Sequence, residues 1–112
     1  MSDQSFDGGE AAILDVGTGT ATLAVAYAEA FPGVRVVGLD VLPRIIALAE
    51  ATVAASSVAD RVEIRRQSVA ELDETDRYAY AWLPAPFVPQ PALRAGVRRV
   101  AAALVPDRRR AT

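Results

Sequence analysis

The chain has 112 residues, of which 52% are hydrophobic and 23% are charged, a composition that predicts one small globular domain. It contains neither cysteine nor histidine, which excludes disulfides, thiolate metal sites and the commonest general base, and we expect no metal ion. A formal net charge of −2 favours neither nucleic acid nor a membrane surface as a partner, and the polar, acidic first residues are unlike a signal peptide, so we expect a cytoplasmic protein.

After a loose lead-in over residues 1–10, apolar runs and helical spacings alternate along the chain. The apolar runs predict strands at 11–16, 34–39, 62–66 and 78–83. Helical spacing predicts helices at about 20–31, from 43 to near 56–57, and at about 91–105, with a turn or a single helical turn over 68–72. Strands that alternate with helices indicate a parallel sheet with right-handed crossovers. We therefore expect a single α/β domain.

The same spacing predicts which side chains the helices bury. The expected buried positions are Leu23, Tyr27 and Ala30 in the first helix, Ile45, Ile46, Ala49 and Val53 in the second, and Leu93, Val97, Val100 and Leu104 in the last.

The strongest local signal is the segment Ile13–Thr20, in which a strand runs into a turn with two glycines and then into a helix. Glycines let the backbone turn sharply and let a ligand approach it, while the helix start offers free N–H groups. Dinucleotides and S-adenosylmethionine both suit such a turn. The dinucleotide pattern has a third glycine where Thr22 stands, and the carboxylate of Asp15 would repel a pyrophosphate. Asp15 can instead hold the amino-acid end of S-adenosylmethionine, directly or through water, so this cofactor is favoured over NAD.

A second carboxylate, Asp40, ends the second predicted strand. Each of its oxygens can accept one ribose hydroxyl, which indicates an adenosine ligand but does not separate NAD from S-adenosylmethionine. The alternative is that Asp15 and Asp40 each cap the helix that follows, as aspartates at strand ends often do. Two aspartates around one glycine turn favour the ligand over the caps.

These segments resemble a known family. ILDVGTGT and VVGLDV resemble the first motif and the following acidic position of class I S-adenosylmethionine-dependent methyltransferases. RVEIRRQSVAEL is similar to the family's third strand and the loop beside the adenine, and YAYAWLPAPF to its fourth strand. The resemblance covers residues 11–106, which would form the cofactor-binding domain, and leaves 107–112 as a tail. It implies a Rossmann-like α/β fold with helices on both faces of about four parallel strands in the order 3-2-1-4.

The resemblance also implies where the sulfonium end and the sugar of the cofactor lie. Gly17, Thr18 and Gly19 would pack against the methionine moiety. Asp40 would hold the ribose, and Leu83 would face the methionine end and the substrate.

The adenine end is implied by weaker motifs. Val41 and Leu42 would lie beside the adenine. Ser68 stands where the family usually has an acidic residue, and Val69 would offer its backbone N–H to the ring. The full set of predicted cofactor-binding residues is Asp15, Gly17, Thr18, Gly19, Thr20, Asp40, Val41, Leu42, Ser68, Val69 and Leu83.

The sequence also departs from the family. Ala21 stands where many members have a third glycine, and the segment Leu83–Phe87 lacks the Asn or Asp of the amino-methylating members. Full members have a seven-stranded sheet, whereas this chain ends soon after the helix that follows the fourth strand. We therefore expect an open edge at the fourth strand, with Trp82 and Phe87 near it, through which two copies could pair.

Three functions remain open. The first is a cofactor-binding methyltransferase domain that acts on a small-molecule acceptor, the second a non-catalytic remnant that dimerises through the open edge, and the third an NAD-binding oxidoreductase domain. No catalytic residue is assigned, because Tyr78, Tyr80 and the acidic residues from Glu71 to Asp76 are only weak candidates for a base.

Overall fold

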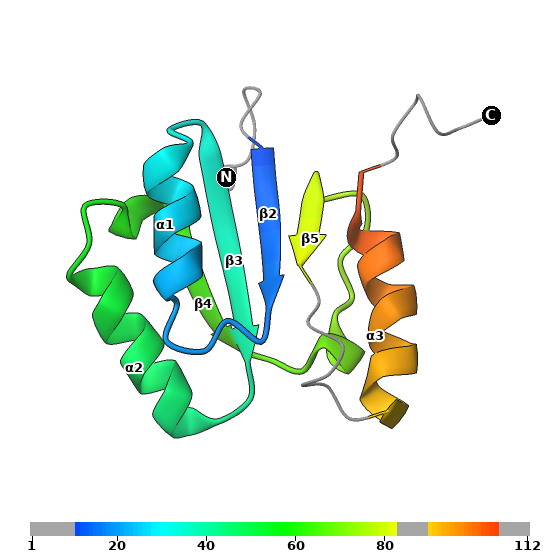
Figure 1. The fold of residues 1–112 in the computed structure, drawn as a ribbon. Coiled ribbons are helices and arrows are strands. Elements are labelled where there is room, and N and C mark those ends of the chain that lie inside the picture. The colour runs from blue at the N-terminus through cyan, green and yellow to red at the C-terminus, as the bar shows by residue number, and fades with distance from the viewer. Residues whose placement is uncertain (1–10, 83–89, 106–112) are drawn as a thin grey trace.

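A computed structural model describes residues 11–82 and 90–105 of the chain. These residues form a four-stranded sheet in the order β4-β3-β2-β5, and every pairing in it is parallel (Figure 1). Its strands are β2 (Ala11–Val16), β3 (Val34–Asp40), β4 (Val62–Arg66) and β5 (Tyr80–Trp82). The predicted Rossmann-like order 3-2-1-4 is confirmed.

Helices cover both faces of the sheet, as predicted (Figure 1). The helices α1 (Thr22–Ala30) and α2 (Pro43–Ala54) lie on one face, and α3 (Gln90–Ala103) lies on the other. Pro43 opens α2, where its fixed φ suits the first turn and its missing N–H costs nothing. Two short 3₁₀ turns, η1 (Ala59–Arg61) and η2 (Val69–Glu71), flank β4.

Strand alternation divides the buried side chains into two clusters, one on each face of the sheet. The cluster under α3 consists of Ala12, Leu14, Val16, Val37, Leu39, Val69, Leu72, Tyr78, Val100 and Ala103. The cluster under α1 and α2 consists of Ala21, Ala24, Val25, Ala28, Val36, Ala49, Val53, Val58 and Val62. Asp15 and Gly38 therefore belong to the α1 face, because they alternate with residues of the α3 cluster.

The predicted buried face of α1 is wrong in two of its three residues, since only Tyr27 packs against the cluster on this side of the sheet. Leu23 is 46% exposed and Ala30 is also exposed, whereas Ala24, Val25 and Ala28 are buried. Small side chains let the helix axis approach the sheet closely, so the alanine stripe faces the core and the larger Leu23 lies outside it.

The predicted stripe of α3 needs a similar correction. Val97 is 51% exposed, although Val100 is buried as expected, and the side chain of Leu93 lies outside the described part of the helix. The buried stripe instead includes Gly96, Val100 and Ala103. Gly96 is required by space, since a Cβ there would lie 2.6 Å from Cγ1 of Val69.

The fourth strand begins two residues later than predicted. Tyr78 lies outside β5 and forms an isolated parallel bridge with Leu104, and its carbonyl accepts the N–H of Val105 at 2.7 Å. Leu83 and Phe87 lie outside the described residues.

Within the described residues, no helix is long and apolar enough to span a membrane.

Candidate functional site

The turn between β2 and α1 has the backbone that its glycines predict. Gly17 and Gly19 have φ values of 70° and 59°, in the left-handed region that only glycine enters without strain. A Cβ on Gly19 would meet no atom of the described residues within 4 Å, so none of them fills the space above this glycine. The turn therefore offers a ligand free access to its backbone.

Hydrogen bonds fasten this turn to the end of β3. The N–H of Thr18 donates to the carbonyl of Leu39 at 2.9 Å, and the N–H of Gly19 donates to Oδ2 of Asp40 at 3.0 Å. The other carboxylate oxygen of Asp40 accepts the N–H of Val41 at 2.8 Å. The two features that the sequence singled out thus meet at the carboxyl edge of the sheet, where parallel α/β folds bind ligands.

Neither aspartate caps a helix, so the alternative that the sequence left open is wrong. The residues at the N-caps of α1 and α2 are Ala21 and Leu42, and neither helix has a side-chain cap. Both carboxylates instead accept hydrogen bonds from residues of the glycine turn. Each oxygen of Asp40 keeps a second lone pair, so the carboxylate can still accept a pair of ribose hydroxyls.

Asp15 is only 3% exposed, beneath the turn. Its Oδ2 accepts a hydrogen bond from the hydroxyl of Thr18 at 3.0 Å, and within the described residues its Oδ1 accepts none. Burial raises the pKa of Asp15, the hydrogen bond from Thr18 opposes this rise, and the charge of Asp40 adds to it. A buried carboxylate with a free oxygen is costly unless a donor from a ligand reaches it.

Apolar and polar groups suited to an adenine lie at the next loops. Val41 and Leu42 follow Asp40 and are 50% and 58% exposed, so their apolar surfaces are available to a flat ring. The hydroxyl of Ser68 accepts the N–H of Ala70 at 3.1 Å and so caps η2. Val69 opens η2, where a backbone N–H has no acceptor within the turn, and its side chain is buried.

The other predicted site residue in the turn, Thr20, is exposed, and its hydroxyl lies 3.1 Å from that of Thr22. These residues fit S-adenosylmethionine in three respects: an oxygen of the buried Asp15 to which no described residue donates, space above Gly19 that no described residue fills, and a carboxylate at Asp40. Across the described part of the chain, no three acidic residues gather in a way that could hold a metal ion.

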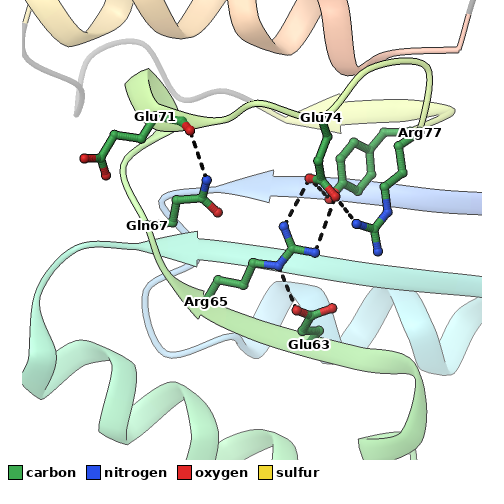
Figure 2. Close-up of polar contacts among 7 residues, drawn as sticks. Glu63, Arg65, Gln67, Glu71, Glu74 and Arg77 are labelled. Atoms are coloured by element: carbon green, nitrogen blue, oxygen red, sulfur yellow. Dashed lines mark hydrogen bonds and ion pairs between the residues drawn. The ribbon is translucent and has the colours of Figure 1, made fainter. Parts of the chain in front are cut away.

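A cluster that the sequence did not predict lies on the α3 face of the sheet (Figure 2). Glu74 accepts hydrogen bonds from Tyr78 Oη at 2.6 Å and from Arg65 Nη1 at 3.1 Å, and it also pairs with Arg77. Arg65 is shared with Glu63, whose Oε2 lies 2.7 Å from Nε. The residues come from β4 and from the loop before β5, and no short sequence motif connects them.

This cluster removes Tyr78 from the candidates for a base. Its side chain is fully buried, and burial raises the pKa of its hydroxyl. Tyr78 also precedes the amino end of β5, whereas the glycine turn follows the carboxyl end of the parallel strand β2. The two therefore lie at opposite ends of the sheet, and Tyr78 has a structural role.

Comparison with known proteins agrees with this geometry. The family model described as a methyltransferase domain matches residues 13–107, and the chain belongs to that family. A curated relative, the tRNA1(Val) (adenine(37)-N6)-methyltransferase of Vibrio campbellii, is 33% identical over 66 residues, which are 59% of this chain and 28% of that protein.

Solved structures share the fold. The [4+2]-cyclase SpnF superposes with a TM-score of 0.78 at 20% identity, over 94% of this chain and 39% of that one. The protein PKMT2 of Rickettsia typhi, solved in complex with AdoHcy, has a TM-score of 0.73 at 23% identity, over 85% of this chain and 19% of that one. The chain thus spans well under half the length of these relatives. Because one of them is named a cyclase, the fold alone does not define the reaction.

Proposed function

We propose that the chain is the S-adenosylmethionine-binding part of a methyltransferase that acts on a small-molecule acceptor in the cytoplasm. The observation that carries this proposal is the bond between Gly19 and Asp40, which joins the glycine turn to a carboxylate suited to a ribose. Asp15 supports it, since the free oxygen of a buried carboxylate suits the ammonium group of the methionine moiety.

In the proposed pose, the cofactor lies across the carboxyl ends of β2, β3 and β4. Gly17, Thr18, Gly19 and Thr20 face its methionine end, beside Asp15. Asp40 accepts the ribose hydroxyls, Val41 and Leu42 cover the adenine, and Ser68 and Val69 border the adenine from the far side. The predicted contact of Leu83 remains part of the proposal, and this residue lies outside the described ones.

The cofactor would supply a methyl group activated by its sulfonium: the acceptor's nucleophile would bond to the methyl carbon in line with the breaking C–S bond, and the sulfur would leave as the neutral thioether of S-adenosylhomocysteine. The residues of this chain would bind and orient the cofactor, and such positioning removes part of the barrier of a bimolecular transfer. We assign no base. The name of the Vibrio campbellii relative specifies a tRNA adenine, but a net charge of −2 does not favour a polyanion here, so a small molecule remains the proposed acceptor.

Backbone amide spectra would test the proposed pose. On titration with S-adenosylhomocysteine, the amide signals of Gly17, Gly19 and Val41 should shift strongly, together with that of Val69. The amide of Asp60, in η1 at the opposite end of β4, is the internal control and should not shift. Shifts confined to the loop before β5 and to α3 would contradict the pose.

A second candidate function is a non-catalytic remnant that dimerises. It rests on the edge strand β5, where Tyr80 is 58% and Trp82 is 48% exposed. Within the described residues, β5 pairs with β2 on one side only. Exposed apolar side chains on such an edge favour pairing with another chain. Sedimentation equilibrium decides this point, because a clean monomer at high concentration excludes the dimer.

A further inference from the structure

Asp15 and Gly38 lie directly opposite each other in the pairing of β2 with β3, on the sheet face that α1 covers. The side chain of Thr18 folds back from the turn onto this pair. Its hydroxyl donates to Asp15 at 3.0 Å, and its side chain lies over Gly38. Three residues from two strands and a turn are thus in mutual contact.

The contact with Gly38 is too close for any other residue. A Cβ at Gly38 would lie 2.6 Å from Oγ1 of Thr18 and 2.8 Å from its Cβ. Gly38 is not among the residues with positive φ, so its backbone does not require glycine. Glycine is needed at position 38 because it leaves space for the side chain of Thr18.

Thr18 cannot yield easily to a larger residue at 38. Its N–H is bonded to the carbonyl of Leu39, and its carbonyl accepts the N–H of Ala21 at 3.0 Å. With the backbone held at both groups and Thr18 only 8% exposed, a Cβ at Gly38 would have to push the hydroxyl away from Asp15.

We propose that Thr18 is a positioning residue that orients the carboxylate of Asp15 toward the amino-acid end of the cofactor, and that Gly38 provides the space this requires. The hydroxyl occupies Oδ2 and leaves Oδ1 to the ligand. This inference rests on the proposed function and adds to it two residues, Thr18 in a new role and Gly38.

Two ligands separate positioning of Asp15 from general damage to the site. S-adenosylhomocysteine carries the amino-acid end, and 5′-methylthioadenosine lacks it. Thr18→Val keeps the shape of the side chain and loses the hydroxyl. It should lower the affinity for S-adenosylhomocysteine roughly tenfold and change the affinity for 5′-methylthioadenosine less than about twofold. Thr18→Ser keeps the hydroxyl and should bind both ligands as the original chain does. Equal weakening of both ligands by Thr18→Val would overturn the proposal.

A double-mutant cycle tests the part played by Gly38. Gly38→Ala should reproduce the selective loss seen with Thr18→Val, because the added methyl displaces the hydroxyl. In the Thr18→Gly background, where Cβ, Oγ1 and Cγ2 are all absent, the same change at Gly38 should add little, less than about twofold. Additive losses would show that Gly38 acts independently of Thr18 and would contradict its assigned role.

A measurement on the ligand-free chain keeps this inference separate from the proposed function. Carbon-detected NMR can follow the titration of the Asp15 carboxyl. Among the described residues, Asp40 is the ionisable group whose charge affects the pKa of Asp15. Thr18→Val should raise the pKa of Asp15 further, and Thr18→Ser should leave it unchanged. If the original chain binds neither adenosyl ligand, the proposed function fails, while the titration still shows whether Thr18 holds Asp15. An unchanged titration in Thr18→Val would overturn the inference.

Discussion

The backbone N–H of Gly19 donates a hydrogen bond to Oδ2 of Asp40 at 3.0 Å, so the turn after β2 is held by the side chain that ends β3. Asp40 also holds its own loop through the N–H of Val41. One carboxylate therefore holds both loops that border the candidate site.

Replacement of Asp40 by alanine should weaken S-adenosylhomocysteine binding by about 1–3 kcal/mol, because two ribose hydroxyls and the N–H of Gly19 lose their acceptor. Isothermal titration calorimetry measures the change. Asp60→Ala, at an exposed position in η1, is the matched control and should leave the affinity as it is. An unchanged dissociation constant for the Asp40 variant would count against the proposed pose.

Asp15→Asn should stabilise the fold at neutral pH and should weaken the binding of S-adenosylhomocysteine. Burial raises the pKa of Asp15 above its ordinary value of 3.8, so the folded chain holds this proton more tightly than the unfolded chain does. The stability that Asp15 contributes is therefore fully present below about pH 4 and is lost as the pH rises through the raised pKa. Urea unfolding measures the free energy of unfolding of both chains at pH 7 and at pH 4. The variant should exceed the original chain by more at pH 7 than at pH 4, and a larger difference at pH 4 would refute this account.

Ala21→Gly should be far milder than Ala24→Gly, although both alanines are fully buried. Ala21 has a φ of 69°, a conformation that costs a non-glycine residue about 1–2 kcal/mol and so offsets the lost methyl group. Ala24 lies inside α1, where glycine costs about 1 kcal/mol in helix propensity and the lost methyl adds to this. Denaturant midpoints compare the two variants, and equal losses would show that no strain is stored at Ala21.

Glu74→Gln should lower the free energy of unfolding by about 1–3 kcal/mol, since its charged carboxylate serves Arg65, Arg77 and Tyr78 (Figure 2). Glu63→Gln is the control, because Glu63 also pairs with Arg65 but its side chain is 52% exposed. That exposed pair should contribute at most about 1 kcal/mol. Chemical denaturation measures the loss in free energy of unfolding for each variant. Equal losses in Glu74→Gln and Glu63→Gln would show that the cluster is only a surface network.

The sequence predicted the parts of the fold whose causes are local. Gly17 and Gly19 were expected to form a sharp turn, and both have positive φ values. The valine-rich runs were expected to be buried parallel strands, and Val36 and Val37 are buried in β3. The second helix was expected to begin at about residue 43, and Pro43 opens α2. In each case the residue type itself restricts the backbone or requires burial.

Features that depend on tertiary contacts were not predicted. The left-handed backbone of Ala21 cannot be read from alanine, which normally avoids it. The buried faces of α1 and α3 follow small residues such as Ala28 and Gly96, whereas apolar spacing favours large ones. Glu74 joins two arginines and a tyrosine only because the loop before β5 folds under α3, a contact that no spacing in the sequence encodes.

The most direct test of the central claim is calorimetric titration of the 112-residue chain with S-adenosylhomocysteine and, separately, with NAD. The buried carboxylate of Asp15 beneath the glycine turn favours an ammonium group and disfavours a pyrophosphate. The account predicts binding of S-adenosylhomocysteine with one site per chain and no detectable heat from NAD. Binding of NAD alone would contradict it.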